Sequence, residues 1–423
     1  MPKKIYIFGY IILFFIIVLF FLSYFKDKTI YIEAGPKGGF FDTSANLLKA
    51  RLKDYNIESE VINREDTINI VEDVNDDNKN IHIGFVAQDL KGKQFKNVKA
   101  LGSLILEPLF IFYRNDLKLN SLADFKGLKL GIGPENSGTR LLAETILNLY
   151  GVNNKNTTFI DKTHSIHFDM MENGTLDIGF FLLPANNQFI FKLGTNPNLK
   201  IFSLNASKAL SRKFDYLYPE VVQAGGFDLK NNIPEEDIQV ISLPVDLVAK
   251  KNLDPSVVVA VSLILKEEFK APNIISDAST FPSMEYIKNL EVNKRAKEII
   301  EMPFGSLPFL YKYLPFGLAS FVDKFGVNLS YILSIIIIFR YMGFPTPFKY
   351  YQTVIDHFYY EKILKINEKS LKNKLSNEDI QFLKKVENYF NKDLVGTFVL
   401  TKKESLAENK VALDIVKEIK KKI

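Results

Sequence analysis

The sequence contains no cysteine and no tryptophan, and only four of its 423 residues are histidine. Without cysteine the chain cannot form a disulfide scaffold, a thiolate zinc or iron–sulfur site, or a cysteine nucleophile. His164 and His167 are the only histidines close together in sequence, and two ligands are too few for us to expect a metal site. A chain without thiols is also at ease in an oxidising compartment outside the cytoplasm.

Motifs that carry catalysis are missing as well. The sequence has no H-E-x-x-H zinc motif and no G-x-S-x-G nucleophile elbow. Gly133 and Gly138 have the spacing of a phosphate-binding P-loop, but Thr139 and Arg140 stand where that loop needs Lys and then Ser or Thr. We therefore expect no enzyme and no cofactor.

The length of 423 residues allows two or three domains and an ample core. Hydrophobic residues make up 47% of the chain and charged residues 24%, which is typical of a globular protein and excludes wholesale disorder.

An apolar run near the start predicts a membrane anchor. Residues 5–25 are 21 residues without a charge, long enough as a helix to cross a hydrocarbon core of about 30 Å. A cleaved signal peptide, the alternative, would have a shorter apolar run followed by small residues at a cleavage site. This run ends in Ser23-Tyr24-Phe25-Lys26, which favours an uncleaved anchor.

A second apolar segment lies at residues 318–344. Its uncharged centre, residues 326–339, has 14 residues, which alone is short for a span. Extension towards Pro315 adds Asp323 and Lys324, which could lie at the membrane interface. The segment is predicted to span the membrane, and a buried or interfacial helix stays open as the alternative.

The net charge of +5 is unevenly distributed. Residues 340–423 carry 17 Lys and Arg against 11 Asp and Glu, whereas residues 26–339 carry 35 against 38. Lys3 and Lys4 precede the first apolar run. Because positive residues flank membrane spans on the cytoplasmic side, we expect both termini inside and the large domain outside. The basicity thus reports topology, and no nucleic-acid partner is expected.

Between the two apolar segments, short β-rich runs alternate with amphipathic stretches, a pattern typical of α/β layers with a mainly parallel sheet. The expected strands lie at residues 29–34, 60–62, 81–86, 109–113, 129–132, 178–183, 201–204 and 240–248. Helices are expected at about residues 42–52, 139–150 and 255–269. In the Lys- and Glu-rich tail, residues 376–379 have the form of a capping box, which predicts a helix to about Phe390 in a small helical tail.

Two loops between an expected strand and helix could hold a ligand. Residues 35–41, G-P-K-G-G-F-F, have adjacent glycines that let the backbone approach a ligand and expose N–H groups. In residues 131–140, G-I-G-P-E-N-S-G-T-R, Ser137 or Thr139 can cap the helix or bind a ligand oxygen, and Arg140 could pair with a carboxylate. A plain glycine turn and an N-cap with a solvated arginine are the alternatives. Open sheets bind ligands at the carboxyl ends of their strands, so two such loops favour binding.

Together, these loops resemble those of the TAXI family, the solute-binding proteins of TRAP transporters. Residues 35–41 are similar to the family's G-x-G-G-x-Y-Y loop, with Phe for Tyr. Residues 124–131, running on to residues 136–140, are similar to its D-L-K-G-K-x-V-x-x-G-x-x-G-S-G-T-R segment. Residues 84–89 resemble the strand end G-F-V-Q-S-D, and residues 174–177 the G-x-x-D turn.

The resemblance continues into the second apolar segment. Residues 313–319, Asp323-Lys324 and residues 345–347 are similar to the Y-L-P-F-W-L-A, D-R and Pro-containing exit of a membrane-anchored subgroup. One segment departs from the family: where members show a G-S-V-E-N-like stretch, this chain has Glu65-Asp66-Thr67-Ile68-Asn69, of which Asn69 fits. Two acidic residues near a pocket would repel an anionic solute.

The resemblance implies a two-lobed type II periplasmic-binding-protein fold that carries terminal transmembrane helices. It divides the chain into residues 1–28 (cytoplasmic start and anchor), 29–110 plus 242–300 (lobe one), 111–241 (lobe two), 301–345 (interfacial segment and second span) and 346–423 (cytoplasmic tail). The ligand-binding residues that it implies are Gly38, Gly39, Phe40, Phe41, Asn69, Gln88, Asn136, Ser137, Gly138, Thr139 and Arg140.

The same resemblance implies a function. A small anionic or zwitterionic solute, an organic acid or an amino acid, would bind between the lobes for delivery to a TRAP-type permease. The protein would be anchored in the bilayer of a bacterial inner membrane with its main domain on the periplasmic side. The alternative is a membrane-anchored ligand sensor or scaffold that signals through its cytoplasmic tail.

Overall fold

The computed structural model describes residues 29–341, 347–372, 374–396 and 403–421. The apolar run at residues 5–25 lies outside the described residues. The chain divides into two compact units, one of residues 25–326 and one that contains residues 327–423. Within the described part of the chain, none of the helices has the length and apolar character needed to cross a membrane.

The first unit contains all the strands that the described residues form. These are β1 (Ile30–Ala34), β2 (Ser59–Asn63), β3 (Ile83–Val86), β4 (Val98–Arg114), β5 (Lys129–Gly131), β6 (Thr158–Ile160), β7 (Ile178–Leu182), β8 (Leu199–Ile201), β9 (Tyr218–Val222) and β10 (Ile238–Lys250). Its helices are α2 (Phe40–Leu52), α3 (Ile70–Asn75), α4 (Gly138–Leu149), α5 (His164–Glu172), α6 (Gln188–Gly194), α7 (Ser207–Lys213), α8 (Pro255–Glu268), α9 (Lys294–Ile300), α10 (Phe309–Tyr313) and the first part of α11 (Phe316–Tyr341).

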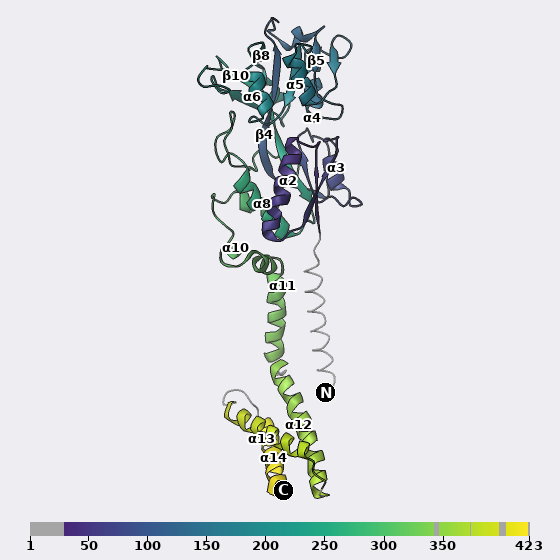
Figure 1. Ribbon diagram of the computed structural model, residues 1–423, viewed down its shortest axis with the longest axis vertical. Coiled ribbons are helices and arrows are strands. Elements are labelled where there is room, and N and C mark those ends of the chain that lie inside the picture. The colour runs from purple at the N-terminus through teal and green to yellow at the C-terminus, as the bar shows by residue number, and fades with distance from the viewer. Residues whose placement is uncertain (1–28, 342–346, 373, 397–402, 422–423) are drawn as a thin grey trace. The chain divides into compact units, whose positions relative to one another are not determined.

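The strands form one path in the order β2-β1-β3-β10-β4-β7-β5-β6, with β8 paired to β4 and β9 to β10. The path falls into two lobes: α2, α3 and α8 lie in lobe one, and α4, α5 and α6 lie in lobe two (Figure 1). The two-lobed α/β fold that the resemblance implies is therefore confirmed.

The long strands β4 and β10 pair antiparallel and belong to both lobes. Leu104 of β4 and Val245 of β10 are in the core of lobe one, whereas Leu109 and Leu243 are in a core of lobe two. The chain therefore crosses between the lobes within these two strands, and β4 can be followed from one lobe into the other in Figure 1.

Local sequence explains the elements that frame the cores. The four residues of β3 are all apolar or glycine and all buried, as expected for a central strand with both faces covered. Helix α8 begins with an Asp254 N-cap and Pro255 in its first turn, and residues 257–266 are buried throughout. Because this helix has no exposed face over that stretch, it fills the centre of lobe one.

Most of the expected strands are confirmed, with three differences. The run at residues 109–113 is only the end of the 17-residue strand β4, the expected strand at 201–204 begins earlier as β8, and β6 and β9 had not been expected. The prediction of a mainly parallel sheet is wrong: β4 and β10 form antiparallel pairs with each other and with β3, β7, β8 and β9. This follows because the chain returns to lobe one along β10, in the direction opposite to β4.

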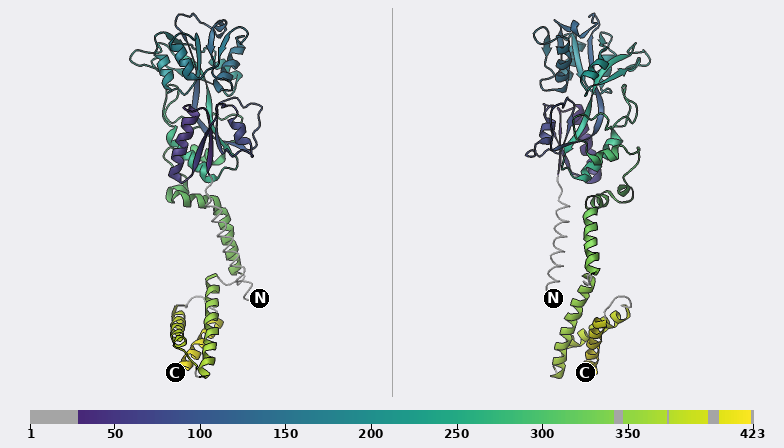
Figure 2. Two further views of the ribbon diagram at one scale, coloured as in Figure 1. Left: turned by 45° about the vertical axis from the view of Figure 1, so that its right-hand side comes forward. Right: turned by 180° about the vertical axis from the view of Figure 1, so that it is seen from behind.

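The second unit contains the end of α11 and the helices α12 (Pro347–Leu371), α13 (Asn377–Gly396) and α14 (Lys403–Lys421), the last three drawn in green to yellow in Figure 2. Eight buried apolar residues form a common core of α12, α13 and α14: Ile363, Ile366, Leu383, Val386, Ala412, Leu413, Val416 and Ile419. The predicted capping box is confirmed, since Ser376 Oγ accepts from Asp379 N at 3.2 Å and Asp379 accepts from Ser376 N at 3.1 Å.

Candidate functional site

A cleft of about 900 Å³ lies between the two lobes. Lobe one lines it with the loop after β1, residues 65–68 before α3, and the end of α8. Lobe two lines it with the loop after β5, the start of α5 and the loop after β7. Ile105 and Glu107 of β4 line it as well, two residues apart and therefore on the same face of the strand. The cleft thus adjoins the crossing between the lobes.

The first predicted loop turns at Gly38, which has a φ of +79°. The Gly38 N–H donates to Asp42 Oδ2 at 2.8 Å, and the Gly39 N–H donates to Pro36 O at 3.1 Å. Hydrogen bonds from the Gly38 N–H lower the pKa of the Asp42 carboxyl. Since helix α2 carries its own carboxylate at its first turn, its N-terminus is less available to an anionic ligand than the sequence suggested.

The second predicted loop ends at a capped helix start. Ser137 is the N-cap of α4: its Oγ accepts from Arg140 N at 3.2 Å and donates to Pro134 O at 2.7 Å. Gly133 turns the loop with a φ of +87°, and a Cβ there would lie 2.9 Å from Ser137 Oγ. No acidic residue lies in the first turn of α4. This helix start is therefore the better place for a ligand oxygen.

His164 adds an uncharged ring to the wall of the cleft. Its Nε2 lies 3.2 Å from Thr139 Oγ1, while its buried Nδ1 has no partner among the described residues. Burial, followed by the nearby His167, lowers the pKa of His164 to about 4. The ring is therefore neutral near pH 7 and brings no positive charge to the cleft.

Glu107 is the most buried acidic residue of the cleft. It is 6% exposed, and neither a hydrogen bond nor a charged neighbour among the described residues contributes to its electrostatics. Burial raises the pKa of Glu107 to about 8. At pH 7 this carboxyl is mostly protonated, because no neighbouring group stabilises its negative charge.

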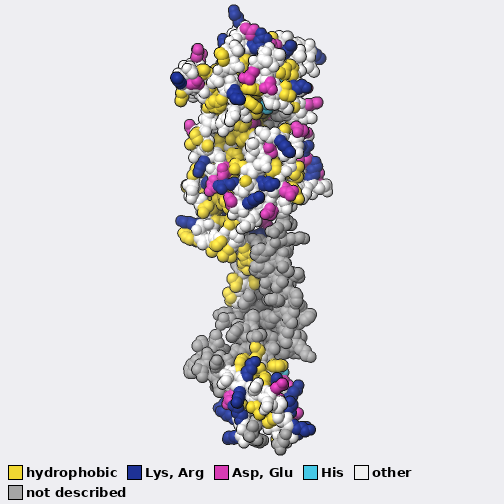
Figure 3. All heavy atoms as spheres, in the orientation of Figure 1, with side chains coloured by type: hydrophobic (Ala, Val, Ile, Leu, Met, Phe, Trp, Pro, Cys, Tyr) yellow, Lys and Arg dark blue, Asp and Glu magenta, His cyan; other side chains and the backbone are white. Residues whose placement is uncertain are grey.

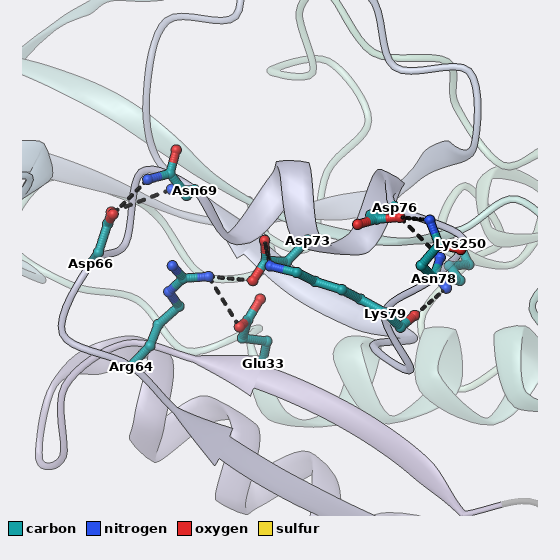
Figure 4. Close-up of polar contacts among 9 residues, drawn as sticks. All are labelled: Glu33, Arg64, Asp66, Asn69, Asp73, Asp76, Asn78, Lys79 and Lys250. Atoms are coloured by element: carbon teal, nitrogen blue, oxygen red, sulfur yellow. Dashed lines mark hydrogen bonds and ion pairs between the residues drawn. The ribbon is translucent and has the colours of Figure 1, made fainter.

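The structure brings most of the predicted ligand-binding residues together. The cleft is lined by nine of the eleven: Gly38, Gly39, Phe40, Phe41, Gln88, Asn136, Ser137, Gly138 and Thr139. Asn69 and Arg140 are not among the lining residues. The Asn69 amide points to Asp66 (Figure 4), and the Arg140 guanidinium pairs with Glu144 at 2.8 Å and with Asp161.

Sequence reasoning missed four groups of lining residues. Glu107 stands alone in an apolar run, Ile-Leu-Glu-Pro-Leu-Phe, and that isolation was the available signal. The sequence singles out His164 only as a possible metal ligand, and no group of three or more His, Asp or Glu suited to a metal occurs among the described residues. The third is Asn187, which lines the cleft and caps α6, and the fourth consists of Glu268 and Phe269 at the end of α8 with residues 271–273 after it. These come from loops without a recognisable motif.

Positive charge is scarce in the cleft. Lys37 is the only Lys or Arg among the lining residues, which also include five carboxylic acids: Glu65, Asp66, Glu107, Glu135 and Glu268. Over the face shown in Figure 3, basic and acidic side chains are interspersed on both lobes. The excess of acidic over basic side chains is therefore specific to the cleft lining and is not seen on the face shown in Figure 3.

Comparison with protein families places the chain. The model of the NMT1-like family matches residues 43–289, more than half of the 423 residues. The chain belongs to the NMT1-like family. The match begins in the first turn of α2, after the loop at residues 35–41, and includes the loop at residues 131–140 and both crossing strands.

Solved structures that match this chain include several binding proteins. An ancestral arginine-binding protein bound to arginine is 15% identical, with a TM-score of 0.36, and the match covers 56% of this chain and 91% of that one. The aliphatic sulphonate binding protein of Escherichia coli is 11% identical, with 57% and 72% covered and a TM-score of 0.36. The GluR0 ligand-binding core with L-glutamate is 10% identical, with 58% and 93% covered and a TM-score of 0.36. Nothing about this chain's ligand follows from these likenesses.

Proposed function

We propose that this protein is a solute-binding receptor that captures a small organic solute between its two lobes. The observation that carries the proposal is the cleft of about 900 Å³, lined from both lobes beside the two strands that connect them. Pockets of this volume suit small molecules. A cleft that spans two lobes also lets ligand binding be coupled to lobe closure by a hinge motion.

A tryptophan reporter tests solute binding. Phe40 lines the cleft, and its ring makes an edge-to-face contact with Phe269, with ring centroids 6.4 Å apart. Phe40→Trp gives the full chain its only tryptophan, so its fluorescence reports on the cleft alone. Ala50→Trp, on the same helix at an exposed position outside the cleft, is the matched control.

The expected result is a saturable fluorescence change of Phe40→Trp with one or more amino acids or organic acids, and no change of Ala50→Trp. The same solutes should raise the melting temperature of the wild-type chain, because a ligand that binds the folded state stabilises it. If a broad panel of such solutes changes neither signal, the receptor function is refuted.

The proposal extends to a membrane setting and a permease. Residues 5–25 would anchor the chain in a bacterial inner membrane with the lobes on the periplasmic side, and a TRAP-type permease would receive the solute. The resemblance to TAXI proteins supports this partner. In spheroplasts, added protease should degrade the lobes and, if residues 318–344 cross the membrane, spare the tail. A permease gene beside this gene, and co-purification of its product, would support transport.

The second unit favours one alternative function, a ligand sensor or scaffold. Its three helices share a core of their own, which is more than a solvated tail requires. A folded unit of this kind is suited to bind a partner protein. If the isolated lobes bind solute but no permease co-purifies, and the tail retains a specific cytoplasmic protein, the sensor function is the better account.

A further inference from the structure

The charges that line the cleft restrict its solute. An anion in a binding site is usually held by an Arg or Lys side chain, and Lys37, exposed in the first loop, is the only such residue in the lining. Two arginines lie next to lining residues in the sequence, Arg64 before Glu65 and Arg140 after Thr139, but both already pair with carboxylates. Arg64 pairs with Glu33 at 3.3 Å and with Asp73, as Figure 4 shows, and Arg140 pairs with Glu144 at 2.8 Å.

Four of the five carboxylic acids of the cleft are at its rim or already have partners. Glu65 and Glu135 are exposed. The Asp66 carboxylate accepts from Ile68 N at 2.9 Å and from the Asn69 amide, and Glu268 pairs with Arg51 at 2.7 Å. These four add negative potential but hold no free, buried position for a ligand.

Glu107 differs from them in geometry. It is 94% buried, lies where the two lobes meet, and faces the cleft beside Ile105. In the described part of the chain neither a hydrogen bond nor a charged neighbour acts on its carboxyl, and its oxygens are not among the enclosed atoms that lack a partner, so they open to the cleft.

We propose that the cleft binds a solute that carries an ammonium or similar cationic group, and that this group pairs with the side chain of Glu107. The inference rests on the proposed receptor function and specifies its ligand class. An amino acid and a simple amine share this chemistry. A dicarboxylate lacks it and would meet several carboxylates with one lysine to offset them.

Pairing with a cation changes the protonation of Glu107. The buried carboxyl is mostly protonated near pH 7, and an adjacent cation favours its ionised form. Binding should therefore release up to one proton to the solvent, and the affinity for a cationic solute should rise between pH 6 and pH 8. Glutarate would produce neither effect through Glu107.

The test uses the full chain in a mild detergent and three solutes of matched length: 1,5-diaminopentane, 5-aminopentanoate and glutarate. A wider panel of amino acids, amines and dicarboxylates extends each class. Melting temperature gives binding, and titration calorimetry at pH 7 in phosphate and in Tris gives the number of protons released. Glu107→Gln removes the ionisable group, and Glu65→Gln, which removes a rim carboxylate of the same cleft, is the matched control.

The expected result is that cation-bearing solutes stabilise the wild type and Glu65→Gln and release a proton. Loss of a buried partner should weaken their affinity for Glu107→Gln about thirtyfold or more. Binding by the diamine or by the amino acids alone identifies which cationic class is used, and either supports the inference.

Two outcomes overturn it. If only dicarboxylates bind, or if Glu107→Gln binds cationic solutes as well as the wild type does, the inference fails while the receptor function stands. If no member of any class binds, both fail. Unfolding of the unliganded Glu107→Gln variant shows whether it retains the native fold, so lost binding cannot be mistaken for lost structure.

Discussion

Replacement of Glu107 by Gln should make the folded lobes more stable, and increasingly so as the pH rises. Burial raises the pKa of Glu107 from 4.5 to about 8 in the folded protein, whereas in the unfolded chain it stays near 4.5. Because the folded-state pKa is the higher one, the wild type suffers no penalty from this group below pH 4.5. Between pH 4.5 and pH 8 it loses stability, since folding must then take up a proton.

The magnitude follows from the size of the shift. Each pKa unit corresponds to about 1.4 kcal/mol, so the wild type should lose about 3 to 4 kcal/mol relative to Glu107→Gln between pH 5 and pH 8. The cost of leaving a polar group without a partner is similar for a protonated Glu and for Gln, so it largely cancels. Gln also preserves the volume of the side chain, so no cavity forms.

The measurement is urea unfolding of the full chain in detergent at pH 5, 6.5 and 8, with circular dichroism as the signal. Asp246 and Glu220 each have a pKa raised to about 7 by burial, so the wild type alone would not isolate Glu107. The difference between wild type and Glu107→Gln removes their contributions. A difference that does not change with pH, or that reverses sign, would refute the assignment of an unpaired buried carboxyl.

Three further changes test other parts of the structure. Arg140→Ala should change solute affinity less than about threefold, because the guanidinium already has two carboxylate partners outside the cleft lining; a loss greater than tenfold in calorimetry would return it to the ligand. Gly133→Ala should destabilise the lobes by about 1–2 kcal/mol in urea unfolding, since it strains a φ of +87° and crowds Ser137; a change below about 0.5 kcal/mol would contradict this. Ser376→Ala should lower the free energy of unfolding of the second unit by about 1 kcal/mol, because it removes the cap bonded to Asp379; an unchanged free energy of unfolding of that unit would disprove this.

The sequence was most informative where local chemistry alone decides the structure. Ser137 caps a helix because its hydroxyl satisfies an amide three residues ahead, a relation that needs no tertiary information. Apolar runs bounded by glycine turns likewise located β1, β5 and β7. The two glycine loops, after β1 and after β5, line the same cleft because the carboxyl ends of both strands face it.

The sequence did not predict the long strands or the partners of individual side chains. Strand β4 contains Gly102, Glu107 and Pro108, which all have low strand propensity, and only its pairing with β10 keeps these residues extended. The unpaired state of Glu107 is a property of the folded cleft, so no pattern could reveal it. For Arg140, the partner Glu144 four residues on was readable from helix spacing, whereas Asp161 comes from the loop after β6.

The route of the chain through β4 and β10 has a consequence for synthesis on the ribosome. Lobe two is formed from one continuous stretch that runs from the second half of β4 to the first half of β10, so it can complete its cores as soon as that stretch has emerged. Lobe one cannot, because Phe85 of β3 pairs with Leu247 of β10, and α8 must still follow to fill the centre. Its first strands must therefore wait, with their apolar faces uncovered, until the inserted lobe has been made, and this interval is when the nascent chain is most exposed to aggregation.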